Sequence, residues 1–278
     1  MKKTLAILST VISLTLALTA CGGNETTSDK TGTASAAASQ KLEKIKIGVS
    51  STPHAVIIEK LQPEFKAAGL DVESVIFEDF VQPNIALNDG SLDANYFQHK
   101  PYFDAFTKEQ KLDLEVLGYV HIEPMGLYST KYKSVDEIKD GDEILLPNDV
   151  TNGARALLLL EKAGLLKLKS DALDVTPLDV KENPKKLKLT QLNAPTIPSA
   201  YKDAAAGVIN SNFLISAGID PSTALIREDG KNNPYANLVA VRKGDAAKEK
   251  FQKLIKVLTS EKAKEIIKTE FKGEIQPA

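Results

Sequence analysis

The chain is poor in several residue types, and each shortage excludes a class of protein. Its 278 residues contain one cysteine, Cys21, which excludes a disulfide framework, a multi-cysteine zinc site and an iron–sulfur cluster. Tryptophan is absent, and 35 Lys and Arg stand against 37 Asp and Glu, for a formal net charge of -2. Because nucleic-acid binding relies on excess positive charge, this balance argues against a nucleic-acid partner.

The first 20 residues have the pattern of an export signal. Lys2 and Lys3 precede an apolar run at 5–18 that is too short for a permanent membrane span. The stretch 18–21 (LTAC) resembles the lipobox of bacterial lipoproteins, in which the cysteine receives a diacylglycerol and the peptide is cut just before it. We therefore expect a lipoprotein signal peptide at 1–20 and a lipid anchor on Cys21, at the extracytoplasmic face of the cell membrane. An ordinary secretory leader is the alternative.

The next segment has the composition of a tether. Residues 22–40 are Gly, Ser, Thr, Ala and other polar residues, with almost nothing apolar that is larger than alanine. Such a segment cannot bury enough apolar surface to offset the entropy of ordering it. We expect 21–42 to be the lipidated cysteine and a flexible linker to the folded body.

From residue 44 onwards the apolar pattern alternates between strand-like and helix-like segments. Period-two runs predict strands, and i, i+3, i+4, i+7 spacing predicts helices. The expected strands are 44–51, 70–77, 92–97, 114–119, 125–129, 143–147, 187–192, 207–211 and 238–241, and the expected helices are 53–69, 82–88, 154–166 and 246–271. This order is typical of an α/β protein with a parallel sheet and right-handed crossovers. Pro63 is expected to kink the first helix.

No compact motif for catalysis or metal binding occurs in the sequence. His54, His99 and His121 are far apart in the chain, and HExxH, GxSxG, GxxxxGK[ST] and GxGxxG stretches are absent. We therefore expect no catalytic residue, metal or cofactor. An exported, tethered α/β chain of this length favours a solute-binding protein whose ligand lies in a cleft between two lobes.

Five motifs occur in an order that resembles one family. They are 97–102 (FQHKPY), 81–84 (VQPN), 146–157 (LPNDVTNGARAL), 208–212 (VINSN) and 233–242 (NPYANLVAVR). Here the chain is similar to the NlpA family of methionine-binding lipoproteins, the substrate-binding components of methionine-importing ABC transporters. The resemblance implies a bilobal, periplasmic-binding-protein-like α/β fold with two interlobe crossovers. It places one lobe at 43–126 plus 242–278 and the other at 127–241, and it implies a permease and ATPase complex as the partner.

A free amino acid requires a cation for its carboxylate, polar acceptors for its ammonium and an apolar wall for its side chain. Arg155, in the first turn of a predicted helix, suits the carboxylate. The resemblance assigns Asn210 and Asn237, each expected to follow a short strand, to the ligand backbone. Asn212, two residues beyond Asn210 on the same strand face, ranks below them. Aromatic rings suit a thioether, and the expected wall is Phe80, Phe97, His99 and Tyr102.

Other ligands and other functions remain open at this stage. The same fold can bind D-methionine, a methionine-containing dipeptide or another apolar amino acid in place of L-methionine. A surface interaction protein or adhesin without a ligand is a second class, and an exported enzyme is a third. The family position of Phe80 is often tyrosine, so a hydrogen bond from a ring hydroxyl is not available there.

Overall fold

The computed structural model describes residues 41–230 and 233–278. The expected signal peptide, Cys21 and nearly all of the expected tether lie outside the described residues. Within the described ranges, we find no helix with the length and apolar character that crossing a membrane requires.

The first sheet is mixed, with strand order β13-β4-β12-β3-β1-β2. Its strands are β1 (Glu43–Val49), β2 (Leu70–Ile76), β3 (Ala94–His99), β4 (Leu114–Ile122), β12 (Ala236–Arg242) and β13 (Gln276–Pro277). β1 is parallel to both β2 and β3, as the sequence predicts. The prediction of a parallel sheet is wrong beyond β3, because β12 inserts between β3 and β4 and runs antiparallel to both.

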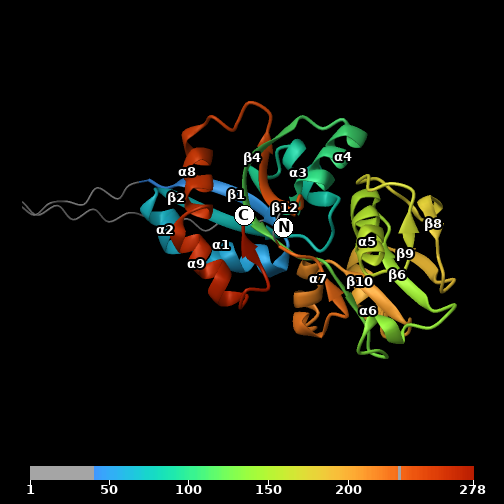
Figure 1. The fold of residues 1–278 in the computed structure, drawn as a ribbon. Coiled ribbons are helices and arrows are strands. Elements are labelled where there is room, and N and C mark those ends of the chain that lie inside the picture. Colours follow the sequence, from blue (N-terminus) through green and yellow to red (C-terminus); the bar gives the residue numbers. More distant parts are fainter. Residues whose placement is uncertain (1–40, 231–232) are drawn as a thin grey trace, which may run out of the picture. The chain divides into compact units, whose positions relative to one another are not determined.

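Alternating residues of β12 bury opposite faces of this sheet. Val239 and Val241 belong to the core under α1 (Val56–Lys60), α2 (Gln62–Ala67), α8 (Glu249–Leu258) and α9 (Glu261–Glu270), whereas Leu238 and Ala240 pack with residues of α3 (Gln82–Asn88) and α4 (Lys100–Gln110). This is the two-residue period of a strand that is covered on both sides. Figure 1 shows α3 and α4 separated from α1, α2, α8 and α9 by the strands.

The helix predictions need correction in three places. The helix expected at 53–69 is a π-helical turn at Ser51–Ala55 followed by α1 and α2, which are divided at Leu61, two residues before Pro63. The helix expected at 246–271 is divided into α8 and α9, because the Ser260 hydroxyl accepts a hydrogen bond from the backbone N–H of Ala263 and caps α9. α4, which follows the FQH stretch, was not predicted.

The second sheet has the order β11-β5-β10-β6-β9. Its strands are β5 (Gly126–Tyr128), β6 (Glu143–Pro147), β9 (Lys188–Leu192), β10 (Ala206–Ile209) and β11 (Ile226–Arg227). Ile144 and Leu146 face the core that includes Leu157 of α5 (Val150–Lys162), and Leu145 faces the opposite core with Ile197 of α6 (Ile197–Ala200). Short elements complete this part: β7 (Lys167–Leu168), β8 (Val180–Glu182), α7 (Ser211–Ser216) and 3-10 turns at Val135–Glu137, Pro177–Asp179, Ala194–Thr196 and Pro221–Thr223.

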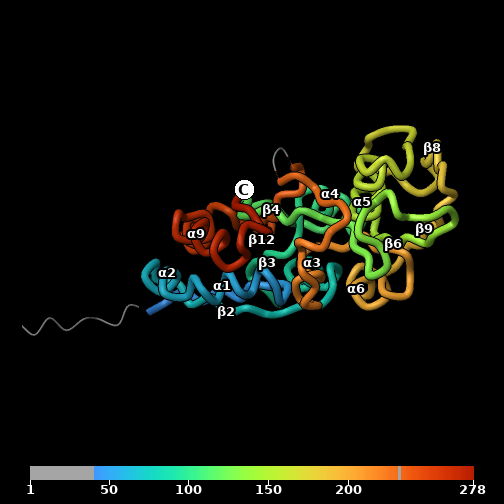
Figure 2. The backbone as a smooth tube through the Cα atoms, turned by 60° about the horizontal axis from the view of Figure 1, so that its bottom comes forward, coloured from blue at the N-terminus to red at the C-terminus, as the bar shows by residue number. Residues whose placement is uncertain are grey.

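The backbone passes from one sheet to the other twice. The first passage is 123–125, between the end of β4 and the start of β5, and the second lies between the end of β11 at Arg227 and the start of β12 at Ala236. The expected lobe boundary at 241/242 is therefore placed too late, because β12 is a strand of the first sheet. In Figure 2, β12 lies beside β3 and β4, whereas β6 and β9 lie near α5. We call the parts built around the two sheets the first and second lobe.

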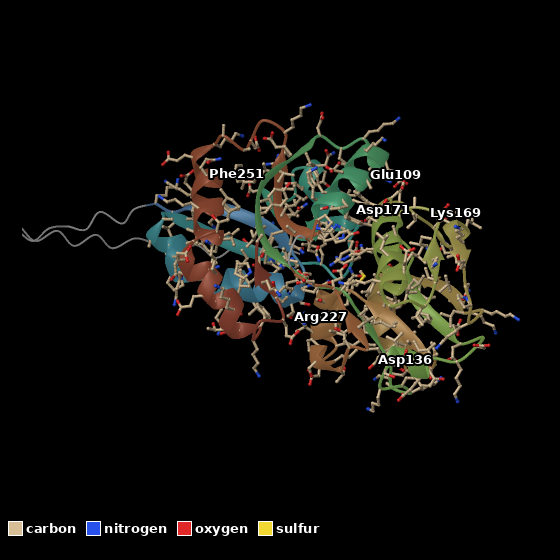
Figure 3. All side chains as sticks on the ribbon, viewed as in Figure 1. Glu109, Asp136, Lys169, Asp171, Arg227 and Phe251 are labelled. Carbon is tan, nitrogen blue, oxygen red and sulfur yellow. The ribbon has the colours of Figure 1, made fainter. Side chains whose placement is uncertain are left out.

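An ion pair ties the second lobe to the C-terminal segment. The guanidinium of Arg227, in β11, bonds to the carboxylate and the backbone carbonyl of Glu274, which precedes β13 of the first sheet. Figure 3 shows Arg227 near the centre of the chain, while the side chains of Glu109, Asp136 and Lys169 lie at its periphery. The pair therefore lies where the backbone returns to the first lobe.

Candidate ligand-binding site

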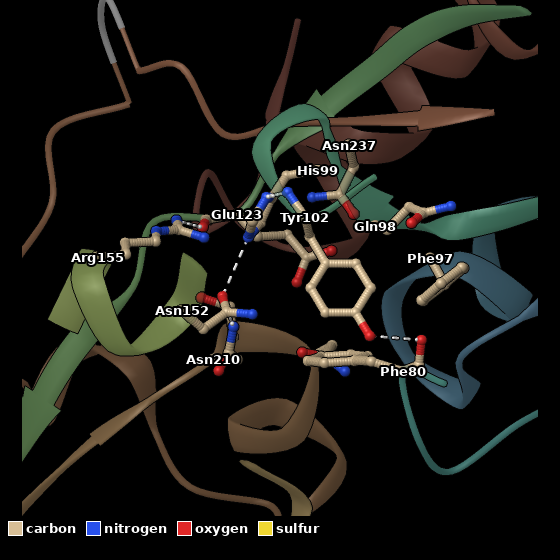
Figure 4. Close-up of a pocket in the computed structure, with 12 residues that line it drawn as sticks. Phe80, Phe97, Gln98, His99, Tyr102, Glu123, Asn152, Arg155, Asn210 and Asn237 are labelled. Carbon is tan, nitrogen blue, oxygen red and sulfur yellow. Dashed lines mark hydrogen bonds between the residues drawn. The ribbon is translucent and has the colours of Figure 1, made fainter. Parts of the chain in front are cut away.

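Residues from both lobes line one pocket. The pocket is narrow, with about 20 Å³ of space open to the centres of water-sized molecules. The first lobe contributes Phe80, Phe97, Gln98, His99, Tyr102 and Asn237, the second contributes Asn152, Arg155, Asn210, Ser211 and Asn212, and Glu123 comes from the first passage between the lobes. The pocket thus brings together the seven residues predicted from sequence, as well as Asn212 (Figure 4).

The local structure around three of these residues differs from the prediction. Arg155 lies in the second turn of α5, because Asp149 caps the helix by accepting from the backbone N–H of Asn152 at 2.9 Å. Asn237 is the second residue of β12 and does not follow a strand. Asn212 does not share a strand face with Asn210, since Asn210 follows β10 and Asn212 is in the first turn of α7.

Four lining residues were missed: Gln98, Glu123, Asn152 and Ser211. Gln98, Asn152 and Ser211 lie within motifs that the sequence analysis singled out. Glu123 follows β4 in a stretch with no motif or periodic pattern, so nothing in the sequence distinguishes it from a surface carboxylate. Its burial depends on how the chain passes between the sheets.

Arg155 is buried and paired within the protein. Its Nε and Nη2 donate to the two carboxylate oxygens of Glu228 at 2.8 and 2.5 Å, and Nη2 also donates to the backbone carbonyl of Glu123 at 2.7 Å. The guanidinium carbon lies 4.2 Å from the centre of the Tyr235 ring, close enough for a cation–π contact. These contacts fix the guanidinium plane at the wall of the pocket.

The charges of this pair stabilise each other despite their burial. Burial alone would raise the pKa of Glu228, but the charge and hydrogen bonds of Arg155 outweigh it and hold the pKa below its ordinary value. Burial would likewise lower the pKa of Arg155, and Glu228 raises it above the usual range. Glu228 also accepts from the backbone N–H of Met125 at 2.9 Å, which ties the pair to the first passage between lobes.

A hydrogen-bond network fixes the orientation of Asn210. The Asn152 amide nitrogen donates to Asp149, so Asn152 Oδ1 is left to accept from Asn210 Nδ2 at 2.8 Å and from His99 Nε2 at 3.0 Å. His99 Nδ1 accepts from the backbone N–H of Tyr102, so the ring proton is on Nε2. Burial and, to a smaller extent, the charge of Arg155 lower the pKa of His99 to about 3, so the ring is neutral at neutral pH.

Two buried polar atoms in the pocket have no hydrogen-bond partner within the described chain. They are Asn210 Oδ1, an acceptor, and Asn212 Nδ2, a donor. A buried polar group without a partner costs about 1–3 kcal/mol, so such atoms in a cavity indicate a ligand that supplies the missing bonds. The pocket therefore offers one open acceptor and one open donor on neighbouring side chains.

Aromatic rings form the other end of the pocket. The Phe80 ring centre lies 6.1 Å from that of Phe97, 5.8 Å from that of Tyr102 and 4.8 Å from that of Phe213 in α7. The Tyr102 hydroxyl donates to the backbone carbonyl of Phe80 at 2.9 Å and holds that segment in place. Burial raises the pKa of Tyr102 well above its usual range, so this hydroxyl keeps its proton. The contact with Phe213 joins the two lobes.

Beside the pocket, two histidines that are distant in sequence come together around Glu123. Glu123 Oε1 lies 2.8 Å from His121 Nε2 and 3.3 Å from His54 Nε2, and these three residues are the one group in the described ranges with metal-ligand spacing. Burial lowers the pKa of His54 to about 4 and that of His121 to about 3, so both rings are neutral. The three ligand atoms are already paired with one another, so their hydrogen bonding is satisfied without an ion.

Comparisons with known proteins agree with this geometry. The chain matches the NlpA lipoprotein family over residues 45–278. The D-methionine-binding lipoprotein MetQ of Salmonella typhi is 41% identical over 233 residues, which are 82% of this chain and 86% of that protein.

Two solved structures are similar at 40% and 39% identity, each with a TM-score of 0.81 over 84% of this chain. They are a nutrient binding protein from Burkholderia cenocepacia bound to methionine and an ABC transporter periplasmic substrate-binding protein from Coxiella burnetii, covered over 99% and 100% of their chains. The expected bilobal binding-protein fold is confirmed, and the chain belongs to the NlpA lipoprotein family.

Proposed function

We propose that this protein binds methionine between its two lobes and delivers it to an ABC importer. The observation that carries the proposal is the polarity of the pocket, which has an open donor and an open acceptor at one end and aromatic rings at the other. A zwitterionic amino acid with an unbranched apolar side chain likewise has polar, charged groups at one end and an apolar chain at the other. The methionine bound to the Burkholderia cenocepacia protein supports this choice.

The carboxylate is assigned to the side of the pocket that carries Arg155 and Asn212. Glu228 engages Nε and Nη2 of Arg155, which leaves Nη1 to donate to the ligand. Asn212 Nδ2 supplies a second donor. Hydrogen bonds to a charged partner are stronger than those between neutral groups, so a carboxylate is the ligand group that these donors favour.

The ammonium is assigned to the acceptors. Asn210 Oδ1 is unpartnered, and the Glu123 carboxylate lines the pocket. Burial raises the pKa of Glu123, while the charge of Arg155 and the backbone N–H of Asn212 oppose that rise. Those neighbours favour the ionised carboxylate, which suits a cationic ligand group.

The methionine side chain is assigned to the ring cluster of Phe80, Phe97 and Tyr102. Sulfur–ring contacts add about 0.3–1.5 kcal/mol to the free energy gained by burial. Because Phe80 also contacts Phe213 of the second lobe, a ligand held by these rings favours the closed form. The closed form is what the permease and its ATPase would recognise, and this role involves binding without catalysis.

A lipid on Cys21 would hold the protein at the extracytoplasmic face of the cell membrane. Membership of a lipoprotein family and the LTAC stretch at 18–21 support this part of the proposal. Replacing Cys21 with serine would then abolish labelling by a radioactive fatty acid and move the protein from the membrane fraction to the soluble fraction. Unchanged fractionation of Cys21→Ser would refute the anchor.

Calorimetric titration of the chain from residue 22 onward, unfolded and refolded to remove carried-over ligand, tests the ligand. We expect saturable one-to-one binding of L-methionine and much weaker binding of L-leucine. D-methionine belongs in the same series, because the Salmonella typhi relative is named for it. Absence of heat with either enantiomer from a folded sample would refute the proposal.

A further inference from the structure

His54 does not line the pocket, yet it bonds to two residues that do. The ring is fully buried in the turn at Ser51–Ala55. Its Nε2 lies 3.1 Å from Asn237 Oδ1 and 3.3 Å from Glu123 Oε1, and both partners line the pocket. One ring nitrogen is therefore shared between two groups that face the ligand.

The partners of His54 assign its proton. Two oxygens face Nε2, and neither the Asn237 carbonyl nor an ionised carboxylate can donate a hydrogen bond. On the other side of the ring, Nδ1 lies 2.6 Å from the Ser50 hydroxyl, which can donate to it. A neutral imidazole has one N–H, so these neighbours place it on Nε2 and leave Nδ1 as the acceptor.

This tautomer determines which end of the Asn237 amide faces the ligand. Because the N–H of His54 holds Asn237 Oδ1, the amide NH2 group is the end that remains for the pocket. We propose that His54 is a positioning residue for the amino-acid site, which orients Asn237 as a donor to the ligand carboxylate and restrains Glu123 as an acceptor. This inference rests on the proposed function, since it names a role in holding an amino acid.

Removing the ring N–H would change the pocket in a defined way. Glu123 Oε1 would lose one of its two histidine donors and keep His121 at 2.8 Å. The nearby Asn237 NH2 group is then the replacement donor for the carboxylate, and turning toward Glu123 takes it away from the ligand. The effect on binding thus passes through Asn237 and does not require the pocket to collapse.

The first test observes the tautomer directly. A long-range proton–nitrogen NMR spectrum of the refolded mature chain, labelled with 15N in its histidines, identifies which nitrogen of each ring carries the proton. The His54 signals, assigned by their loss in His54→Gln, are expected to show a protonated Nε2. A protonated Nδ1 would overturn the proposal, and this result does not depend on whether any variant binds ligand.

The second test compares His54→Leu and His54→Gln by calorimetry with L-methionine. Leucine has no donor, and we expect it to weaken binding by about 10- to 100-fold, whereas the glutamine NH2 group can reach the same oxygens and should restore binding to within about fivefold of wild type. Ile58→Ala, at an equally buried position in α1 away from the pocket, controls for lost stability. It should keep wild-type affinity.

A double-mutant comparison distinguishes a positioning role of His54 from general damage to the pocket. If His54 acts through Asn237, His54→Leu should cost much less affinity in an Asn237→Ala background than in the wild type. Equal costs in both backgrounds would overturn the proposal, as would wild-type affinity in His54→Leu.

Should His54→Leu fail to fold, Ser50→Ala replaces it, since loss of the donor to Nδ1 frees the tautomer and should weaken binding severalfold. Failure of the wild type itself to bind methionine would instead refute the proposed function.

Discussion

Arg155 and Glu228 form a two-point ion pair at the wall of the pocket, with nitrogen–oxygen distances of 2.8 and 2.5 Å. The pair is nearly buried, with 3% and 13% of the two side chains exposed. A planar guanidinium with two of its nitrogens held by Glu228 cannot turn, so its remaining nitrogen points in one direction. Under the proposed function, Glu228 therefore prepares Arg155 for a ligand carboxylate before any ligand arrives.

Replacing Glu228 with alanine should strongly destabilise the ligand-free protein. A buried arginine without its counter-ion costs about 3–5 kcal/mol of unfolding free energy. Glu274→Ala is the matched control, because the Arg227–Glu274 pair is more exposed and its loss should cost about 1 kcal/mol or less. Urea unfolding followed by circular dichroism measures both variants, and equal losses would show that the Arg155–Glu228 pair has no special role.

Asn210→Ala and Asn212→Ala should lose affinity while keeping stability. Each substitution removes an atom that has no partner in the described chain, and Asn152 Oδ1, which loses its Asn210 donor, still accepts from His99. The ligand-free protein therefore loses little, whereas a hydrogen bond to a charged ligand group is worth about 1.5–3 kcal/mol. That corresponds to a loss of about 10- to 150-fold in affinity for methionine.

Asn95→Ala is the matched control for these two variants. Asn95 is fully buried and donates to the Pro83 carbonyl at 3.2 Å and to Asn84 Oδ1 at 2.8 Å, and it does not line the pocket. It should lose stability and keep most of its affinity. Thermal unfolding and calorimetry on the three variants decide the point, and the same pattern in all three would contradict the assignment of Asn210 and Asn212.

The ring cluster predicts a preference for sulfur over a methylene group. Norleucine has nearly the shape of methionine but lacks the thioether, so methionine should bind about 2- to 12-fold more tightly, which corresponds to about 0.3–1.5 kcal/mol from sulfur–ring contacts. In Phe80→Leu one ring is lost, and the preference should shrink. Competition titrations of the two ligands test this, and an unchanged preference in Phe80→Leu would remove Phe80 from the thioether contact.

Acidification should destabilise the ligand-free protein through its histidines. The pKa values of His54, His99 and His121 are lowered from 6.5 to about 4, 3 and 3, mainly by burial. Between pH 6.5 and about 4 the unfolded chain therefore binds protons that the folded chain does not, and stability falls as the pH falls. The raised pKa values of Glu123 and Asp149 act in the opposite direction.

His99→Gln isolates one of these contributions. In this variant the unfolded chain no longer takes up a proton at position 99. The loss of unfolding free energy on acidification from pH 6 to pH 5 should therefore be smaller than in wild type by up to about 1.4 kcal/mol per pH unit. Urea titrations at the two pH values measure the slope. A variant slope as steep as that of the wild type would show that His99 does not titrate differently in the folded state.

The sequence predicts the residues of this site better than it predicts how they are held. The FQHKPY stretch places Phe97, His99 and Tyr102 at the end of β3 and the start of α4, where their positions follow from local chain geometry. Asn237 joins them through a long-range event, the insertion of β12 between β3 and β4, which no periodic pattern encodes. Glu123 and Glu228 could not be found from spacing, because their burial depends on where the chain passes between two lobes.

The fold shows the same division between local and non-local information. Local apolar patterning locates β1, β2 and β6 closely: burial alternates in part of β1 and β2, whereas β6 is a short apolar run that is buried on both faces. The break at Ser260 escapes a periodicity argument, since the apolar spacing of α8 continues into α9 with little change. A new helix nevertheless begins there, because the Ser260 hydroxyl accepts a hydrogen bond from the backbone N–H of Ala263 and caps α9.

The central claim is that the pocket holds both charges of a free amino acid. The most direct measurement is the affinity of the refolded chain for L-methionine, for methioninol, which lacks the carboxylate, and for 4-(methylthio)butanoate, which lacks the ammonium group. We predict that each analogue binds at least about 10-fold more weakly than L-methionine, because each leaves buried polar groups unpaired. An analogue that binds as tightly as L-methionine would contradict the account.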